Sequence, residues 1–277
     1  MGKLDWTRRL CVLVTCLLVT FFLSGCSFGP NQPRYALIAP AKEAFKTGKL
    51  VVVPAKVMQE YVSSGDKAMD AYLTSHPEVW QKPIAEYLQE TLHKKMINVK
   101  IVQVNCENFK NLLQKVLAKY GRKGFINPTT DKFDEKFYKQ VMLDLANQYH
   151  ATLVVPYLIL KSAHFTNKRL FDLLGTAKAD WDGVSRTVDT GGSNFEHFIL
   201  QEQVEGNIPV YSLHVEIYTP QRQIYWGNGG FDLKCKLKAG FGNDRFENIK
   251  LDSLFQNNEK HIQEAVEQAF GLFVNKL

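Results

Sequence analysis

The side chains whose types could carry out chemistry are spread along the chain without a catalytic spacing. Glu196-His197 is the nearest approach to a reactive pair, and the alternative interpretation is a solvated loop residue. Gly191-Gly192-Ser193 lacks the flanking strand and helix of a Gly-x-Ser-x-Gly nucleophile turn. No His-Glu-x-x-His helix and no close zinc-ligand spacing occurs among the histidines, which are His76, His93, His150, His164, His197, His214 and His261. We therefore expect no catalytic residue, no metal and no cofactor.

Carboxylates leave one catalytic possibility open. Asp180, Asp182 and Asp189 do not have the spacing of a calcium loop with its closing glutamate. Glycan hydrolysis requires two carboxylates at a set distance from each other, and a sequence does not give that distance. A hydrolase acting on the cell wall therefore remains an alternative.

Cys26 is the residue for which the sequence predicts a definite chemistry. Residues 1–25 have the layout of an export signal, with a positive start at Lys3, Arg8 and Arg9 and an apolar run over residues 11–23. That run is shorter than the ~20 residues that a permanent membrane-spanning helix needs. The alternatives are a transmembrane anchor, or a plain signal followed by a coincidental cysteine.

The pattern Leu23-Ser24-Gly25-Cys26 resembles the lipobox of bacterial lipoproteins. This resemblance implies a diacylglycerol thioether on Cys26, cleavage just before it, and acylation of the new amino group. Several acyl chains anchor a protein stably, because each buried methylene contributes ~0.8 kcal/mol. By the sorting habit of that family, Ser27 in place of aspartate favours a periplasm-facing location at the outer membrane.

Composition narrows the classes of partner. The formal charge of +6 includes a net +2 from Lys3, Asp5, Arg8 and Arg9, which leaves +4 on the mature chain. A charge of this size does not indicate nucleic-acid binding. After processing, Cys106 and Cys235 are the remaining thiols in an oxidising compartment, and they either pair or stay buried.

Periodicity predicts the elements of a single domain over residues 49–277, after a proline-rich tether over residues 26–48. Strands are expected at residues 49–54, 98–104 and 151–165, and a hairpin at 210–238 around Pro220-Gln221-Arg222. Helices are expected at residues 84–95, 107–120, 132–149 and 259–277. The predicted fold class is mixed α/β (α+β), with a mixed β-sheet covered by helices, a late antiparallel hairpin and a C-terminal helix.

Three features inside the strands and helices carry structural expectations of their own. Pro156 implies a bulge or an edge position in its strand. The glycines after Trp226 imply a bulge or a close approach of backbones. Gly121 stands where a helix C-cap is expected.

The layout of these elements resembles the TolB N-terminal-like envelope lipoproteins. The resemblance is carried by Leu50-Val-Val-Val-Pro54, the helix ending at Lys95, Ala151-Thr-Leu-Val-Val-Pro156 and the hairpin from Tyr211 to Trp226. That group includes the curli secretion channel lipoprotein and the outer-membrane activators of penicillin-binding proteins. The departures are the helix pair between Glu107 and Tyr149 and the long irregular insertion at about residues 166–209.

The insertion is the expected partner surface. Aromatic side chains are favoured as anchors at interfaces, and the candidates here are Phe171, Trp181, Phe195 and Phe198. The alternative is that they form a satellite core of the insertion itself.

We expect a lipid-anchored periplasmic accessory or structural subunit of a bacterial envelope complex that acts by partner binding, in transport, secretion or cell-wall synthesis. Its partners would be the membrane, through lipid on Cys26, and envelope proteins, with no nucleic acid. A self-assembling outer-membrane secretion channel or ring, which would be a homo-oligomer, is the second hypothesis. The cell-wall hydrolase is the third.

Overall fold

The computed structural model describes residues 34–63, 78–167, 176–189, 204–231, 237–238 and 259–277. The chain divides into two compact units, Met1–Pro33 and Arg34–Leu277. The first unit, which includes the expected lipidation site Cys26, lies wholly outside the described residues. The domain described below is the second unit.

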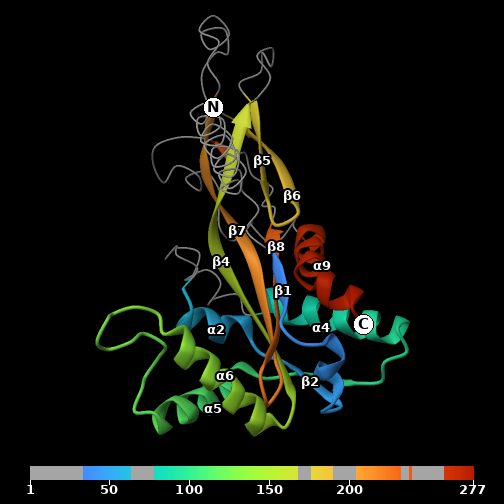
Figure 1. Cartoon of the computed structure of the whole chain (residues 1–277), viewed down its shortest axis with the longest axis vertical. Coiled ribbons are helices and arrows are strands. Elements are labelled where there is room, and N and C mark those ends of the chain that lie inside the picture. The colour runs from blue at the N-terminus through green and yellow to red at the C-terminus, as the bar shows by residue number, and fades with distance from the viewer. Residues whose placement is uncertain (1–33, 64–77, 168–175, 190–203, 232–236, 239–258) are drawn as a thin grey trace, which may run out of the picture. The chain divides into compact units, whose positions relative to one another are not determined.

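One mixed sheet forms the centre of this domain (Figure 1). Its strand order is β1-β8-β7-β4-β5-β6-β9, and β2 pairs with both β4 and β3. Strand β2 runs parallel to β3 and β4, β6 runs parallel to β9, and the other pairs are antiparallel. The strands are β1 (Tyr35–Leu37), β2 (Lys49–Val52), β3 (Lys100–Gln103), β4 (Thr152–Asn167), β5 (Thr176–Trp181), β6 (Val184–Asp189), β7 (Val204–Tyr218), β8 (Gln223–Phe231) and β9 (Leu237–Lys238).

Helices cover both faces of the sheet (Figure 1). Helices α4 (Glu78–Lys94) and α9 (Glu259–Asn275) pack on one face, which we call the α9 face. Helices α2 (Ala55–Tyr61), α5 (Cys106–Lys119) and α6 (Glu135–Tyr149) pack on the other, which we call the α6 face. Alternate residues along β2 and Val53, which follows it, divide between the two cores, with Leu50 and Val52 in one and Val51 and Val53 in the other. The predicted mixed α/β class, the late hairpin β7–β8 and the C-terminal helix are confirmed.

The paired strands β4 and β7 run the length of the sheet, from Leu153 opposite Tyr218 to Asn167 opposite Val204. Pro156 keeps the regular register opposite Val215, so the predicted bulge is wrong. The edge alternative holds, because β2 pairs with β4 only as far as Val154. Beyond that point the side chain of Gln59 in α2 bonds to the free edge of β4. The backbone N–H of Leu158 donates to Gln59 Oε1 at 3.0 Å.

Helix α9 lies almost on the backbone of β8. A Cβ added to Gly229 would stand 1.8 Å from the carbonyl oxygen of Ala265, and one added to Gly227 would stand 2.1 Å from that of Ala269. The register with β7 is regular across these glycines. The predicted close approach of backbones is therefore confirmed, and no bulge occurs there.

The second half of the expected tether is folded. Strand β1 pairs with β8, and the 3-10 helix η2 (Ala41–Phe45) buries Ala41 and Ala44. We call residues 34–48 the N-terminal strap. The expectation of a tether over residues 26–48 is wrong from Arg34 onward, because short apolar stretches on either side of Pro40 pack against the sheet edge and the core.

Two helices differ from expectation. Helix α2 forms where no element was expected, and α4 begins at Glu78, which places Pro83 inside it. A proline inside a helix lacks the N–H that would bond the preceding turn. Burial explains the earlier start, since Trp80 packs edge-on against Phe231 with ring centroids 5.3 Å apart. Helices α5, α6 and α9 match their predictions to within a few residues, and Gly121 takes the expected C-cap conformation with φ of 65°.

The expected irregular insertion contains regular structure. Strands β4 and β7 extend into it, and β5 and β6 form a hairpin between them. Asp182 and Gly183 make the two-residue turn with φ of 38° and 91°, as an Asp-Gly hairpin requires. None of the described helices is long and apolar enough to cross a membrane.

Candidate functional site

Of the four aromatic residues proposed as a partner surface, Trp181 is the one that the structure describes. Phe171, Phe195 and Phe198 lie outside the described residues. Trp181 is buried, and its indole N–H donates to the carbonyl oxygen of Tyr211 at 3.2 Å. The core alternative therefore holds for Trp181, because the β5–β6 turn folds back onto the sheet and carries this side chain with it.

A buried ion pair fastens that turn to the α6 face of the sheet. Asp182 accepts hydrogen bonds from Lys161 Nζ at 2.9 and 3.0 Å and from Ser212 Oγ at 2.6 Å. The Asp182 side chain is 3% exposed, so these donors take the place of water around its carboxylate. The backbone adds a further bond, from Gly230 N–H to Asp182 O at 2.9 Å. We call this set the hairpin latch.

A second polar cluster lies further along the same face of β7. Alternate residues Ser212, His214 and Glu216 point to the α6 face, between apolar residues that point to the α9 face. Glu216 accepts from Tyr138 Oη at 2.6 Å and from Gln223 Nε2 at 3.0 Å. We call the group Tyr138, His214, Glu216, Gln223 and Asn228 the β7 polar network.

Burial sets the protonation of the tyrosines in and around this network. Removal from water raises the pKa of Tyr138 well above its ordinary value, and the charge of Glu216 raises it further. The same two causes raise the pKa of Tyr157 and Tyr218. These phenols therefore stay protonated, and Tyr138 is a permanent donor to Glu216.

His214 has the side-chain type of a general base, and both of its ring nitrogens face side chains of the network. Its Nδ1 lies 2.6 Å from Asn228 Oδ1, an oxygen that can only accept, so this nitrogen carries the proton. Its Nε2 lies 3.6 Å from Glu216 Oε1. The ring is stacked on Trp226 at 5.9 Å between centroids and lies 4.9 Å from Tyr157. The hydrogen bonds of the network join α6 to β7, and they tie His214 and Glu216 to other side chains of the domain.

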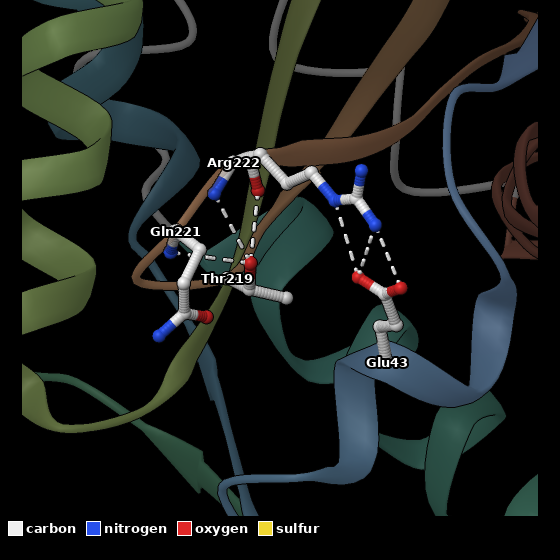
Figure 2. A network of polar contacts seen from close by, with 4 residues as sticks. All are labelled: Glu43, Thr219, Gln221 and Arg222. Atoms are coloured by element: carbon white, nitrogen blue, oxygen red, sulfur yellow. Dashed lines mark hydrogen bonds and ion pairs between the residues drawn. The ribbon is translucent and has the colours of Figure 1, made fainter.

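The N-terminal strap is the third candidate, and its fastening is shown in Figure 2. Arg222, in the β7–β8 turn, makes a forked contact with Glu43 of η2, with distances of 2.7, 2.9 and 3.2 Å. Thr219 Oγ1 stabilises the turn by accepting from the Gln221 and Arg222 backbone N–H groups at 3.4 and 3.2 Å. This arrangement holds the strap to the end of the hairpin.

The arginine also controls the protonation of its partner. The guanidinium of Arg222 holds the pKa of Glu43 below its ordinary value, chiefly through the hydrogen bonds. Glu43 is therefore ionised, with Arg222 as its ion-pair partner and Lys42 and Lys46 as weaker electrostatic neighbours.

Metal ligands do not gather in the described part of the domain: no three side chains of His, Cys, Asp or Glu lie close enough there to hold an ion. Cys106 is half-buried at the first residue of α5, and Cys235 lies outside the described residues. The expected choice between a disulfide and separate thiols therefore stays a prediction.

Sequence reasoning missed the two polar clusters on β7. A signal was present: Ser212, His214 and Glu216 alternate with Leu213, Val215 and Ile217 along a strand that helices cover on both faces. Polar residues at every second position of such a strand need buried partners. Their partners Tyr138, Lys161 and Asp182 are distant in sequence and could not be assigned from it.

Comparisons of this chain with protein-family models, with curated proteins and with solved structures find no match.

Proposed function

We propose that the protein is a lipid-anchored, periplasm-facing accessory or structural subunit of a bacterial outer-membrane envelope complex, and that it acts by binding partner proteins. The observation that carries this proposal is the pattern Leu23-Ser24-Gly25-Cys26 directly after an export-signal layout. Acyl chains on Cys26 would hold the domain at the membrane.

The position of the folded domain supports a role close to the membrane. Strand β1 begins at Tyr35, nine residues after Cys26. Nine residues span at most about 30 Å when fully extended. The domain would therefore bind partners that are themselves in or near the membrane, rather than reach far into the periplasm.

The polar chemistry of the described residues favours binding over catalysis. The side chains that could act as acid, base or nucleophile, His214, Glu216 and Asp182, bond to other side chains of the domain. In addition, β3 pairs with β2 alone among the described strands and is an edge strand within that set. An extended segment of a partner can add to such an edge through main-chain hydrogen bonds.

The test is to follow lipid attachment and assembly in cells that export the full chain. Cys26→Ser should remove the mass of the acyl groups and release the protein from the membrane fraction. Cys16→Ser is the matched control, because Cys16 lies in the apolar run that leaves with the signal, and it should change neither. A membrane-bound, acyl-free Cys26→Ser protein would contradict the proposal.

Native mass spectrometry of the lipidated protein then separates the kinds of assembly. A stable heteromeric complex would support an accessory subunit and identify its pathway. A large homo-oligomer would favour the secretion ring instead. A monomer that degrades cell-wall material would favour the hydrolase.

A further inference from the structure

We propose that the N-terminal strap is a membrane-docking surface, which lies against the anionic headgroups of a lipid layer. This inference rests on the proposed lipid anchor at Cys26 and deepens it: the anchor would fix not only the location of the domain but also which face of it meets the membrane.

Chain length makes the strap the part of the domain with the shortest connection to the lipid. Residues 27–34 separate Cys26 from Tyr35, the first residue of β1. The Cα atoms of Cys26 and Tyr35 can therefore be at most about 30 Å apart. A domain held on so short a connection stays within contact distance of the headgroup layer.

Two large, mainly apolar side chains of the strap are exposed. Tyr35 is 41% exposed and Ile38 is 51% exposed, although Leu37 between them packs on the core. Strand β1 ends the path of strands in the sheet and pairs with β8. Tyrosine is favoured at the membrane interface, because its ring prefers the acyl boundary and its hydroxyl prefers the headgroups.

The charge of the strap complements an anionic lipid surface. Its charged residues are Arg34, Lys42, Glu43 and Lys46, which sum to +2. Lys42 and Lys46 are exposed, and no ion pair joins either of them to a described carboxylate. Glu43 forms its ion pair with Arg222, whose positive charge lies beside the strap. Basic side chains near an anionic bilayer are attracted to it within a Debye length.

The strap is also held in place before it meets the membrane. Pairing of β1 with β8 and the forked contact of Arg222 with Glu43 fix it to the hairpin (Figure 2). A preorganised surface loses little conformational entropy when it docks.

The test uses the full lipidated protein in vesicles of phosphatidylethanolamine and phosphatidylglycerol, with brominated acyl chains as a short-range quencher. The variant Ile38→Trp places a reporter on the strap. The control Met96→Trp places one in the loop between α4 and β3, at a side chain that is 95% exposed. Emission of the native protein, whose described tryptophans are Trp80, Trp181 and Trp226, is subtracted from both.

We expect the emission of the reporter at position 38 to fall by about half in brominated vesicles, and that of the reporter at position 96 to stay unchanged. Joint replacement by Lys42→Gln and Lys46→Gln should reduce the docked-to-undocked ratio on the order of 5-fold per lysine at low salt. The matched pair Lys82→Gln and Lys94→Gln, both on α4 and 71% exposed, should leave that ratio unchanged.

Flotation with the vesicles separates the two proposals. A protein that floats but shows no quenching at position 38, or equal quenching at both positions, would overturn the docking surface and leave the lipid anchor standing. A protein that does not float and lacks acyl mass would overturn the proposed function and, with it, this inference.

Discussion

The two faces of the central strands are packed by different means. On the α9 face, helix and strand meet backbone to backbone, over Gly227 and Gly229. On the α6 face, buried polar side chains join the layers, through Tyr138 and Glu216 at one point and Lys161 and Asp182 at another. Both faces have an apolar core, but the contact with α9 also requires glycines without side chains, whereas the α6 face adds hydrogen bonds between buried side chains.

This difference predicts how each face fails. A close-packed backbone contact cannot accept an added atom, because neither main chain can move without its whole element. A buried polar contact fails when one partner is removed, because the other is left without hydrogen bonds in a medium of low polarity. The predictions below run from the largest expected effect to the smallest.

Substitution Gly229→Ala should be the most damaging change. The new methyl group would stand 1.8 Å from the carbonyl oxygen of Ala265, so α9 would have to move off the sheet. We expect the free energy of unfolding to fall by about 4 kcal/mol, measured by denaturant titration. The control is Gly271→Ala on α9, where nothing lies within 4 Å of the added atom. That change should stabilise the helix by up to about 1 kcal/mol. Equal effects at the two glycines would contradict the backbone contact.

Removal of the cation of the hairpin latch should have the second-largest effect on stability. Lys161→Met leaves Asp182 buried with Ser212 as its remaining side-chain donor. We expect a loss of about 2 to 3 kcal/mol, concentrated in the opening of the β5–β6 hairpin and measured by hydrogen exchange of its amides. Lys94→Met, which breaks the exposed ion pair with Glu90, is the control and should cost less than about 0.5 kcal/mol. Exchange in the hairpin that is the same in both variants would show that the latch does not hold it.

Loss of one hydroxyl from the β7 polar network should have a moderate effect. Tyr138→Phe removes a donor to Glu216 but leaves Gln223 in place, so the free energy of unfolding should fall by about 1 to 2 kcal/mol at pH 8. Tyr120→Phe, which breaks an exposed bond to Asp144, is the matched control and should cost less than about 0.5 kcal/mol.

The same variant should change the response to alkali. The folded protein raises the pKa of Tyr138, Tyr157, Tyr218 and Tyr225 above the ordinary value of 10.0. The unfolded chain then releases these protons first, so the stability that they contribute is complete below about pH 10 and is lost as the pH rises further. Between pH 10 and 11 each tyrosine should lower the free energy of unfolding by about 1.0 kcal/mol, and Tyr138→Phe should remove one such contribution. An unchanged slope in stability measurements between pH 10 and 11 would contradict the burial of Tyr138.

The smallest effect is expected at the end of the hairpin, where neither face is involved. Arg222→Lys keeps the charge but loses the forked contact with Glu43. The pKa of Glu43, which Arg222 holds below its ordinary value, should rise toward that value, as followed by carboxyl NMR. Because the folded pKa is the lower one, this pair stabilises the protein above the ordinary pKa of a glutamate, and its contribution is lost as the pH falls through the folded value. The control is Gln221→Lys in the same turn, which keeps the forked contact. It should change the pKa of Glu43 less than Arg222→Lys does.

Much of the fold could be predicted from local patterns. Alternation and apolar runs located β2, β3, β4 and the hairpin β7–β8, and the helical period located α5, α6 and α9. The glycines of β8 predicted a close approach, which α9 makes. The helix that was missed, α2, is short, and the start of α4 was placed too late because Pro83 breaks a local rule inside it. Their stability comes from contacts with distant parts of the chain rather than from propensity.

The candidate site was less predictable for the same reason. Trp181 carries the residue type of an interface anchor, but its burial depends on how the β5–β6 turn folds back onto Tyr211, 30 residues away in sequence. Tyr138 and Glu216 are 78 residues apart, and their bond exists only because α6 crosses β7 at that point. No local pattern contains that information.

By itself, then, the sequence determined the kind of element at most positions, the export-signal layout and the lipobox-like pattern at Cys26, because periodicity and short motifs are properties of neighbouring residues. Only the tertiary structure decided that residues 34–48 fold against the sheet, which polar residues meet inside it, and that Tyr35 and Ile38 remain exposed. The physical reason is that burial and pairing are set by the register of strands and the docking of helices, which join residues that the chain keeps far apart.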